Sequence, residues 1–145
     1  MKAEILPGLW IGTLSLKDQS EFLTDKNIKG FLNLEKDLDY LYQDLEYQDV
    51  VKQNILKYRI IKLAEYLKDA TTYIYRKLSN SEGILLVSKN GVAKTDYLLV
   101  AYLMRYVKCP RDIAIKILGS KILEPIQMNT LQVKALALFI QRLEK

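Results

Sequence analysis

The stretch of residues 83–104, GILLVSKNGVAKTDYLLVAYLM, constrains the fold of this chain more than any other. Residues 83–87 are apolar without alternation, which is typical of a central strand covered on both faces. A polar loop containing Gly91 follows, and the next segment is apolar almost all round, which indicates a buried helix. A strand, a tight loop and a helix often form a cradle for phosphate, because the amides at a helix N-terminus attract anions. The stretch therefore predicts an α/β domain with an anion-binding type of loop.

Shorter patterns on either side predict a small sheet and several helices. EILPGLWIG indicates two strands around Pro7 and Gly8, and IKGFLNL indicates a short buried strand. In residues 55–63 apolar and basic side chains alternate, which is the period of a half-exposed strand. We expect helices over residues 15–27, along a face of Leu38, Leu41 and Leu45, along a face of Leu67, Ala70, Ile74 and Leu78, from Pro110 to about Gly119, and along a face of Leu136, Phe139, Ile140 and Leu143. This order fits one α/β domain over residues 1–145, with a small, mostly parallel sheet flanked by helices.

Composition narrows the chemistry that the chain can perform. It has no histidine, which excludes catalytic triads, histidine-based acid–base catalysis and most zinc or iron sites, and we expect no cofactor. The single cysteine, Cys109, excludes an internal disulfide and suits a reducing compartment. The net charge of +5 comes from basic residues interleaved with acids, so we expect no dense nucleic-acid patch. With no long apolar run and no apolar signal region, we expect a soluble protein of the cytoplasm or nucleus, without membrane contact.

Three segments together resemble a known family. ILPGLWIG resembles the first strand pair of the dual-specificity protein phosphatases, and IKGFLNL resembles their following strand. GILLVSKNGVAKTDYLLVAYLMR resembles their signature segment, in which a strand ends in His-Cys and a loop of five residues leads to an arginine and a helix. The resemblance covers essentially the whole chain in order. It implies the cysteine-dependent phosphatase-like fold, with a phosphate loop at Ser88, Lys89, Asn90, Gly91, Val92, Ala93, Lys94 and Thr95.

The positions that carry chemistry depart from the family pattern. The nucleophilic cysteine of the family falls on Ser88, its preceding histidine on Val87, and its loop arginine on Lys94. The field of a phosphate loop lowers the pKa of a thiol into the physiological range, but a serine hydroxyl starts far higher and stays protonated. A lysine keeps the positive charge and loses the planar fork that holds two phosphoryl oxygens. The resemblance therefore implies a phosphatase frame from which the reactive groups are missing.

Two further features bear on catalysis: the position of the general acid, and Asp96 at the start of the helix after the loop. The family's general-acid aspartate would follow a strand near Leu63, where this chain offers only Glu65 or, a turn later, Asp69. Asp96 lies in the first turn of the helix after the loop, where a carboxylate favours the positive end of the helix dipole. It is either an ordinary first-turn acid or an internal plug that repels a bound phosphate, and both interpretations stay open.

Other interpretations of the loop fit less well. A nucleotide-binding P-loop would need glycines where Leu86 and Ala93 stand. Ser88 would also result from a cysteine-to-serine trapping change in a live enzyme, although Val87 and Lys94 would not accompany such a change. Cys109 precedes Pro110 at a helix boundary, and we interpret it as structural.

The sequence thus resembles the catalytically inactive, STYX-like pseudophosphatases of the family, which implies a protein-interaction or scaffolding role. We expect a protein partner, with phosphoproteins included, and at most weak phosphate binding in the loop. The acidic, tyrosine-rich residues 40–47 are the candidate partner surface, because they lack the clean apolar face of a core helix. A weak phosphatase using Ser88 and Lys94 and a basic nucleic-acid-associated protein remain as alternatives, and no oligomeric state is indicated.

Overall fold

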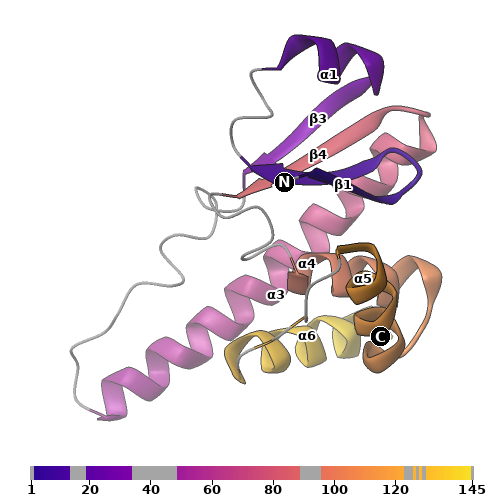
Figure 1. Ribbon diagram of the computed structural model, residues 1–145. Helices are drawn as coiled ribbons and strands as arrows, with labels where there is room; N and C mark the ends of the chain where they lie inside the picture. Colours follow the sequence, from indigo (N-terminus) through magenta and orange to yellow (C-terminus); the bar gives the residue numbers. More distant parts are fainter. Residues whose placement is uncertain are drawn as a thin grey trace.

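A computed structural model of the chain describes residues 2–13, 19–33, 49–88, 96–122, 126, 128 and 130–144. Within these ranges a four-stranded sheet lies beside a group of helices (Figure 1). The elements in chain order are β1 (Lys2–Leu6), β2 (Leu9–Thr13), α1 (Ser20–Asp25), β3 (Ile28–Asn33), α3 (Asp49–Ser79), β4 (Gly83–Ser88), α4 (Asp96–Tyr102), the π-helix η3 (Leu103–Val107), α5 (Arg111–Ile122) and α6 (Thr130–Leu143).

The sheet has the strand order β1-β2-β4-β3. Strands β1 and β2 form an antiparallel hairpin around Pro7 and Gly8, and Gly8 has the positive φ of 88° that a tight turn of this kind requires. Strand β4 pairs in parallel with β2 on one side and with β3 on the other. The predicted α/β fold with a small, mostly parallel sheet is therefore confirmed, and the apolar run at residues 83–87 is its central strand.

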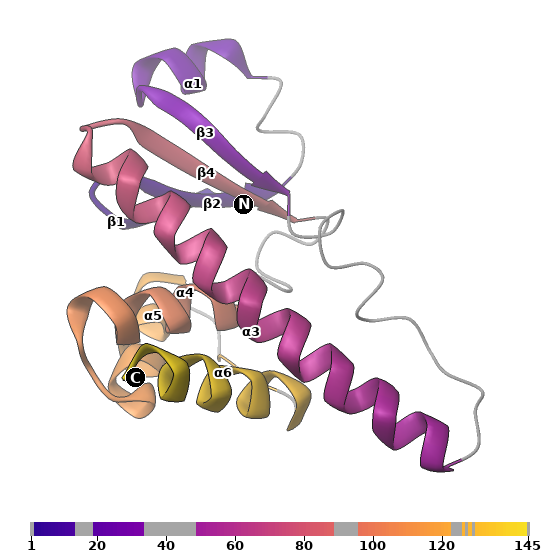
Figure 2. The same ribbon diagram turned by 180° about the vertical axis from the view of Figure 1, so that it is seen from behind.

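Helices cover the two faces of this sheet unequally (Figures 1 and 2). On one face Ile84 and Leu86 of β4 join the main core with α3, α4, α5 and α6. On the other face Leu85 packs with Phe22 and Ile28, which belong to α1 and β3. From Tyr97 to Tyr102 helix α4 is buried, as its apolar sequence predicts, because it lies between the sheet and the other helices.

The strand predicted for residues 55–63 is wrong: these residues belong to α3, a helix of 31 residues. The buried positions Leu63, Leu67 and Ile74 follow the spacing of one helical face, which continues back toward Ile60. No glycine or proline lies between residues 49 and 82 to separate a strand from a helix. The alternation of residues 55–60 was therefore a local pattern that the longer helical pattern overrides.

Several other boundaries can be compared with the expectations. Helix α1 begins at Ser20 and buries Phe22, while residues 14–18 and the expected helical face at residues 38–45 lie outside the described ranges. Helix α5 follows Pro110 as expected but continues through Gly119 to Ile122. The expected inner faces of α3 and α6 are confirmed, because Leu67, Ala70 and Ile74 are buried in α3 and Leu136 and Phe139 are buried in α6. None of the helices in the described ranges is long and apolar enough to span a membrane.

Candidate functional site

The carboxyl ends of three parallel strands meet at one edge of the sheet. Thr13 at the end of β2 is aligned with Ser88 at the end of β4, and Asn33 at the end of β3 is aligned with Val87. In open α/β sheets, ligands bind just beyond the carboxyl ends of the strands, where the connecting loops lie. Ser88, the predicted vestigial nucleophile, thus stands at the end of the central strand on the edge where a site is expected.

The loop itself is bounded by two well-packed elements. It leaves β4 after Ser88, and α4 begins at Asp96. The predicted phosphate-loop residues between them, Lys89, Asn90, Gly91, Val92, Ala93, Lys94 and Thr95, lie outside the described residues, as do the side chains of Val87, Ser88 and Asp96. The structure therefore positions the frame of the predicted site and does not describe its interior.

Burial explains why this frame is firmly placed. Ile84, Leu85 and Leu86 of β4 are fully buried, and the residues that follow Asp96 in α4, beginning with Tyr97 and Leu98, are fully buried too. Transfer of such side chains out of water contributes about 2 kcal/mol each, so the strand end and the helix start are held by the core rather than by the loop. This is the arrangement that a backbone cradle for an anion requires.

The residues near the predicted general-acid position lie on a helix and do not follow a strand as expected. Leu63 is buried in α3, and Glu65 and Asp69 are exposed on the same helix. One carboxylate oxygen of Glu65 lies 3.5 Å from Nζ of Lys62. Glu65 also lines a cavity of about 320 Å³ between α3 and α6, whose lining includes no residue of the strand ends. No strand precedes Glu65 or Asp69 in α3, so neither follows a strand as the general acid of the resemblance would.

Cys109 lies at the far end of the helical stretch that begins after the loop. Its half-buried thiol contacts the backbone oxygen of Leu103 at 3.8 Å. The whole helical segment from Asp96 to Val107 lies in the chain between Cys109 and the loop that follows β4. This placement supports the structural interpretation of Cys109.

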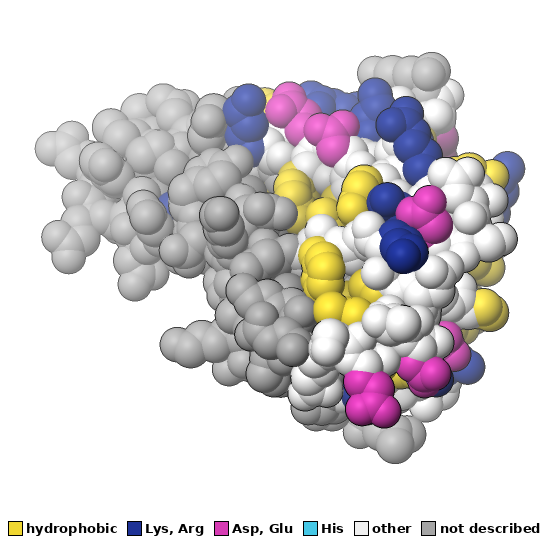
Figure 3. All heavy atoms as spheres, turned by 90° about the horizontal axis from the view of Figure 1, so that it is seen from above, with side chains coloured by type: hydrophobic (Ala, Val, Ile, Leu, Met, Phe, Trp, Pro, Cys, Tyr) yellow, Lys and Arg dark blue, Asp and Glu magenta, His cyan; other side chains and the backbone are white. Residues whose placement is uncertain are grey.

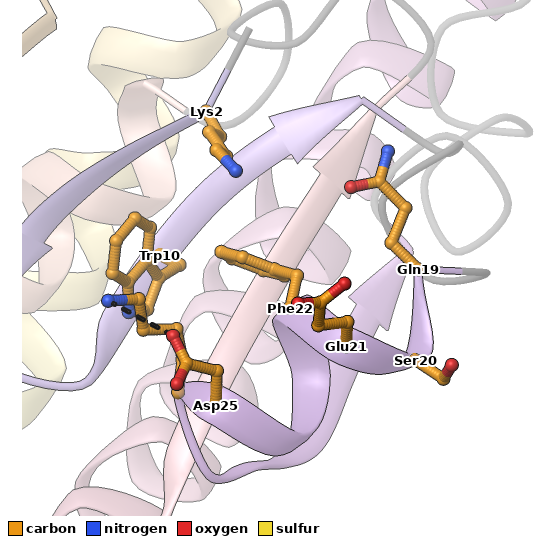
Figure 4. Close-up of a pocket in the computed structure, with 8 residues that line it drawn as sticks. Lys2, Trp10, Gln19, Ser20, Glu21, Phe22 and Asp25 are labelled. Carbon is orange, nitrogen blue, oxygen red and sulfur yellow. Dashed lines mark ion pairs between the residues drawn. The ribbon is translucent and has the colours of Figure 1, made fainter.

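A groove on the other face of the sheet was not predicted from the sequence (Figure 4). Its floor holds Trp10 and Phe22, whose rings meet edge to face with centroids 5.2 Å apart. Nζ of Lys2 lies 4.8 Å from the Phe22 ring centroid, and Nζ of Lys26 lies 5.5 Å from that of Trp10. The acidic side chains of Glu21 and Asp25 in α1 also line the groove, so they balance the charges of Lys2 and Lys26. Figure 3 shows one face of the molecule on which hydrophobic side chains gather among charges of both signs.

The alternation of β2 could have indicated this groove, since Trp10 stands between the buried residues Leu9 and Ile11. The same alternation places it opposite the main core. Within the described residues, no three side chains of His, Cys, Asp or Glu come together in a way that would hold a metal ion.

Comparison with known proteins identifies the fold of the chain but finds no relative by sequence. No protein-family model matches the chain. No curated protein matches it in sequence. Solved structures, in contrast, match over nearly its whole length.

Three of these structures illustrate the likeness. A leucine-rich-repeat and phosphatase-domain protein from Entamoeba histolytica is 21% identical, with a TM-score of 0.73 over 99% of this chain and 92% of that chain. The human tyrosine phosphatase-like serine/threonine/tyrosine-interacting protein is 14% identical, with a TM-score of 0.71 over 99% of this chain and 98% of that chain. Human DUSP28 is 17% identical, with a TM-score of 0.68 over 99% of this chain and 95% of that chain. The chain thus has the fold of the dual-specificity phosphatases.

Proposed function

We propose that this chain, which has the fold of the dual-specificity phosphatases, is catalytically inactive and acts as a protein-interaction or scaffolding module. One observation carries the proposal: the central strand β4 ends in Ser88 in a chain that contains no histidine. The fold gives the position at which a nucleophile would stand, and the residue there cannot ionise near neutral pH without a base.

The groups around Ser88 agree with this proposal. Lys94 stands where the resemblance places an arginine, and the loss of one preorganised contact to the transition state commonly costs on the order of 3 kcal/mol. We infer that no general acid assists the reaction, which removes a further factor of roughly a hundred or more. Glu65 and Asp69 do not restore this function, because they lie on α3 and Glu65 faces α6.

The Ser88→Cys variant tests the proposal against a trapping change in a live enzyme and against a weak phosphatase. We expect no aryl phosphate hydrolysis from Ser88→Cys alone, because the thiolate would still lack the arginine fork and the acid. Adding Val87→His and Lys94→Arg should recover a trace of activity at most. Robust turnover from the single change would contradict the proposal and favour the trapping interpretation.

The partner should be bound mainly outside the loop. A loop that keeps its inward amides and lacks the arginine fork should bind phosphate with millimolar affinity or worse, on the order of 4 kcal/mol. The surface we propose is that of residues 40–47, which lie outside the described ranges. Residues Asp44 and Glu46 supply its acidic side chains.

Affinity purification from the native cell, followed by pull-down with variants, tests this arrangement. Charge reversal at Asp44 and Glu46 should abolish capture of the partner, whereas Lys94→Ala should leave it unchanged. Loss of the partner with Lys94→Ala alone would mean that the loop is the binding site. Retention of the partner by the charge-reversal variant would exclude residues 40–47.

A further inference from the structure

An arginine is held in place where η3 meets α3. The two N–H groups of Arg105 Nη1 donate to three oxygens of α3, so one of them is shared: the acceptors are the backbone oxygen of Lys68 at 3.0 Å, Oγ1 of Thr71 at 2.9 Å and Oγ1 of Thr72 at 2.8 Å. The guanidinium carbon also lies 4.9 Å from the centroid of the Tyr106 ring. These contacts fix the plane of the guanidinium on a half-buried side chain.

Among the residues that the structure describes, hydrogen-bond partners of Arg105 lie at Nη1 alone. Nε and Nη2 donate no hydrogen bond to the residues that the structure describes, and the guanidinium forms no ion pair with their carboxylates. The planar fork of arginine matches a carboxylate in a bidentate contact. Since the side chain is already ordered, binding an anion through the open edge would lose little further conformational entropy.

Aromatic side chains extend the surface beside Arg105. The ring of Tyr106 stacks on Tyr75 of α3, with centroids 4.4 Å apart and planes inclined by 9°. Tyr75 is 48% exposed and Val107, which follows Tyr106, is 50% exposed. Tyrosine and arginine around an apolar patch are the residue types that dominate the binding energy of protein interfaces.

The π-helical turn brings these side chains toward α3. Its wide turn is closed by the hydrogen bond from the amide of Lys108 to the oxygen of Leu103 at 3.0 Å, and Lys108 has a φ of 61°. Single π-helical turns occur frequently at functional sites, where they re-aim side chains. A left-handed lysine costs on the order of 1 kcal/mol, which the surrounding packing must offset.

Charge determines what this surface would attract. The exposed cations Arg76 and Lys108 flank the stacked tyrosines in sequence, and neither forms an ion pair with a described carboxylate. Asp69 of α3 and Asp112 of α5 are carboxylates of the neighbouring elements, and they form no ion pair with these cations either. Among the described residues, the charges here that form no ion pair are therefore mainly positive, and they favour an acidic partner.

We propose that the surface formed by Tyr75, Arg105, Tyr106 and Val107, called here the Arg105 surface, binds an acidic protein segment that carries an aromatic side chain. A carboxylate of the segment would accept two hydrogen bonds from the open edge of Arg105, and the ring would pack on Tyr75. Arg105, Tyr106 and Val107 lie at the end of the α4–η3 stretch that is farther along the chain from the loop after β4. It is thus independent of whether that loop binds phosphate.

Peptide binding to the full chain tests the proposal. The probe is the acetylated, amidated peptide DEFED, and its affinity is measured by calorimetry at low salt. The isosteric neutral peptide NQFQN should bind at least tenfold more weakly, because it lacks carboxylates for Arg105. DEAED should bind several-fold more weakly, because it lacks the ring. Failure of DEFED to bind at millimolar concentration, or equal binding of NQFQN, would overturn the proposal.

Variants locate the binding on the molecule. Tyr75→Leu keeps the helix and removes the ring, and we expect a loss of roughly fivefold. Lys108→Gly removes a charge at a backbone position that glycine favours, and we expect a loss of about two- to threefold. Arg105→Lys should lose tenfold or more, since lysine lacks the fork. The matched control is Lys116→Ala on the exposed side of α5, which should leave the affinity unchanged.

Two outcomes would exclude the Arg105 surface as an acidic-peptide site. If circular dichroism shows that Arg105→Lys does not fold, the DEFED affinities of Tyr75→Leu and Lys108→Gly test the proposal instead. Wild-type affinity in both of these variants would mean that the peptide binds elsewhere on the molecule. An oligothymidylate of about ten nucleotides serves as the competing ligand. Tighter binding of this strand than of DEFED, weakened by the same variants, would assign the surface to single-stranded nucleic acid instead.

Discussion

Strand β4 and helix α4 lie inside the molecule, whereas the first turns of α3 extend past the other helices along its outside (Figure 2). Leu86 and Leu98 are fully buried in the first region, and Ile61 of the second is 39% exposed. In the dual-specificity phosphatase-like frame, the first region would carry the nucleophile and the second would lead to the general acid. Residues 55–63, which the sequence predicted as the strand that leads to the general acid, belong to the continuous helix α3.

The two regions differ in what fixes their structure: core packing fixes β4 and α4, and a continuous helix occupies the predicted position of the general acid. The core on the nucleophile side includes Leu86 of β4 and Leu98 of α4, whereas the side chains at the reactive positions of the resemblance, Ser88 and Lys94, lie outside the described residues. The core contacts that the structure describes therefore involve neither of these positions. The resemblance places the general acid after a strand near Leu63, and α3 instead passes through that position as one helix from Asp49 to Ser79. The fold is therefore held by core packing that does not depend on the reactive groups, which we propose to be absent.

The substitution Ile61→Pro tests the helical state of the outer region and should have the largest effect on stability. Proline inside a helix removes a hydrogen bond and clashes with the preceding turn, so we expect a loss of about 3 kcal/mol in the free energy of unfolding. Urea unfolding measures the loss, with Ile61→Ala as the control at about 0.5 kcal/mol or less. Equal stability of the two variants would argue for an extended segment at residues 55–63 and would restore the predicted strand.

The substitution Gly30→Ala tests whether the second half of α3 packs on β3 as closely as the structure shows. A Cβ atom at residue 30 would lie 2.5 Å from Oη and 3.2 Å from Cζ of Tyr73, so the tyrosine must move. We expect a loss of about 1–2 kcal/mol, as for other overpacked positions. In the Tyr73→Phe background most of this loss should disappear. An equal loss in both backgrounds would show that α3 does not pack on β3 through Tyr73.

These two predictions also show what the sequence could and could not reveal. Residues 83–87 are apolar on both faces, and only a covered central strand fits that pattern. Residues 55–60 alternate over a length at which helix and strand cannot be told apart by period alone. Leu67, Ala70 and Ile74 gave the correct helix because their pattern spans several turns.

The Arg105 surface could not be predicted from the sequence. Arg105 and its partners Thr71 and Thr72 stand more than thirty residues apart, and no local pattern links them. The π-helical turn that brings Tyr106 onto Tyr75 depends on the packing of α4 against α3. Side-chain contacts of this kind follow from tertiary structure alone.

The alkaline stability of the protein tests the buried end of α4. Burial, together with the neighbouring Tyr106 and Tyr75, raises the pKa of Tyr102 from 10.0 to about 12. The folded state therefore holds this proton more tightly than the unfolded state does, and stability should fall as the pH rises from 10 to about 12.

The matched variant for this prediction is Tyr102→Phe, which has no proton to lose. Its free energy of unfolding should decline less than that of the wild type over the same pH range, as measured by urea titrations. Parallel curves for the two proteins would mean that Tyr102 is solvated, and would contradict the burial of this end of α4.

The measurement that tests the central claim most directly is the hydrolysis of p-nitrophenyl phosphate by the wild-type chain and by Ser88→Ala, at high enzyme concentration. The account predicts that neither protein releases p-nitrophenol faster than buffer does, because Ser88 stays protonated and Lys94 lacks the arginine fork. A rate that is the same in both proteins would come from a contaminant. Turnover by the wild type that Ser88→Ala abolishes would contradict the account and make Ser88 a working nucleophile.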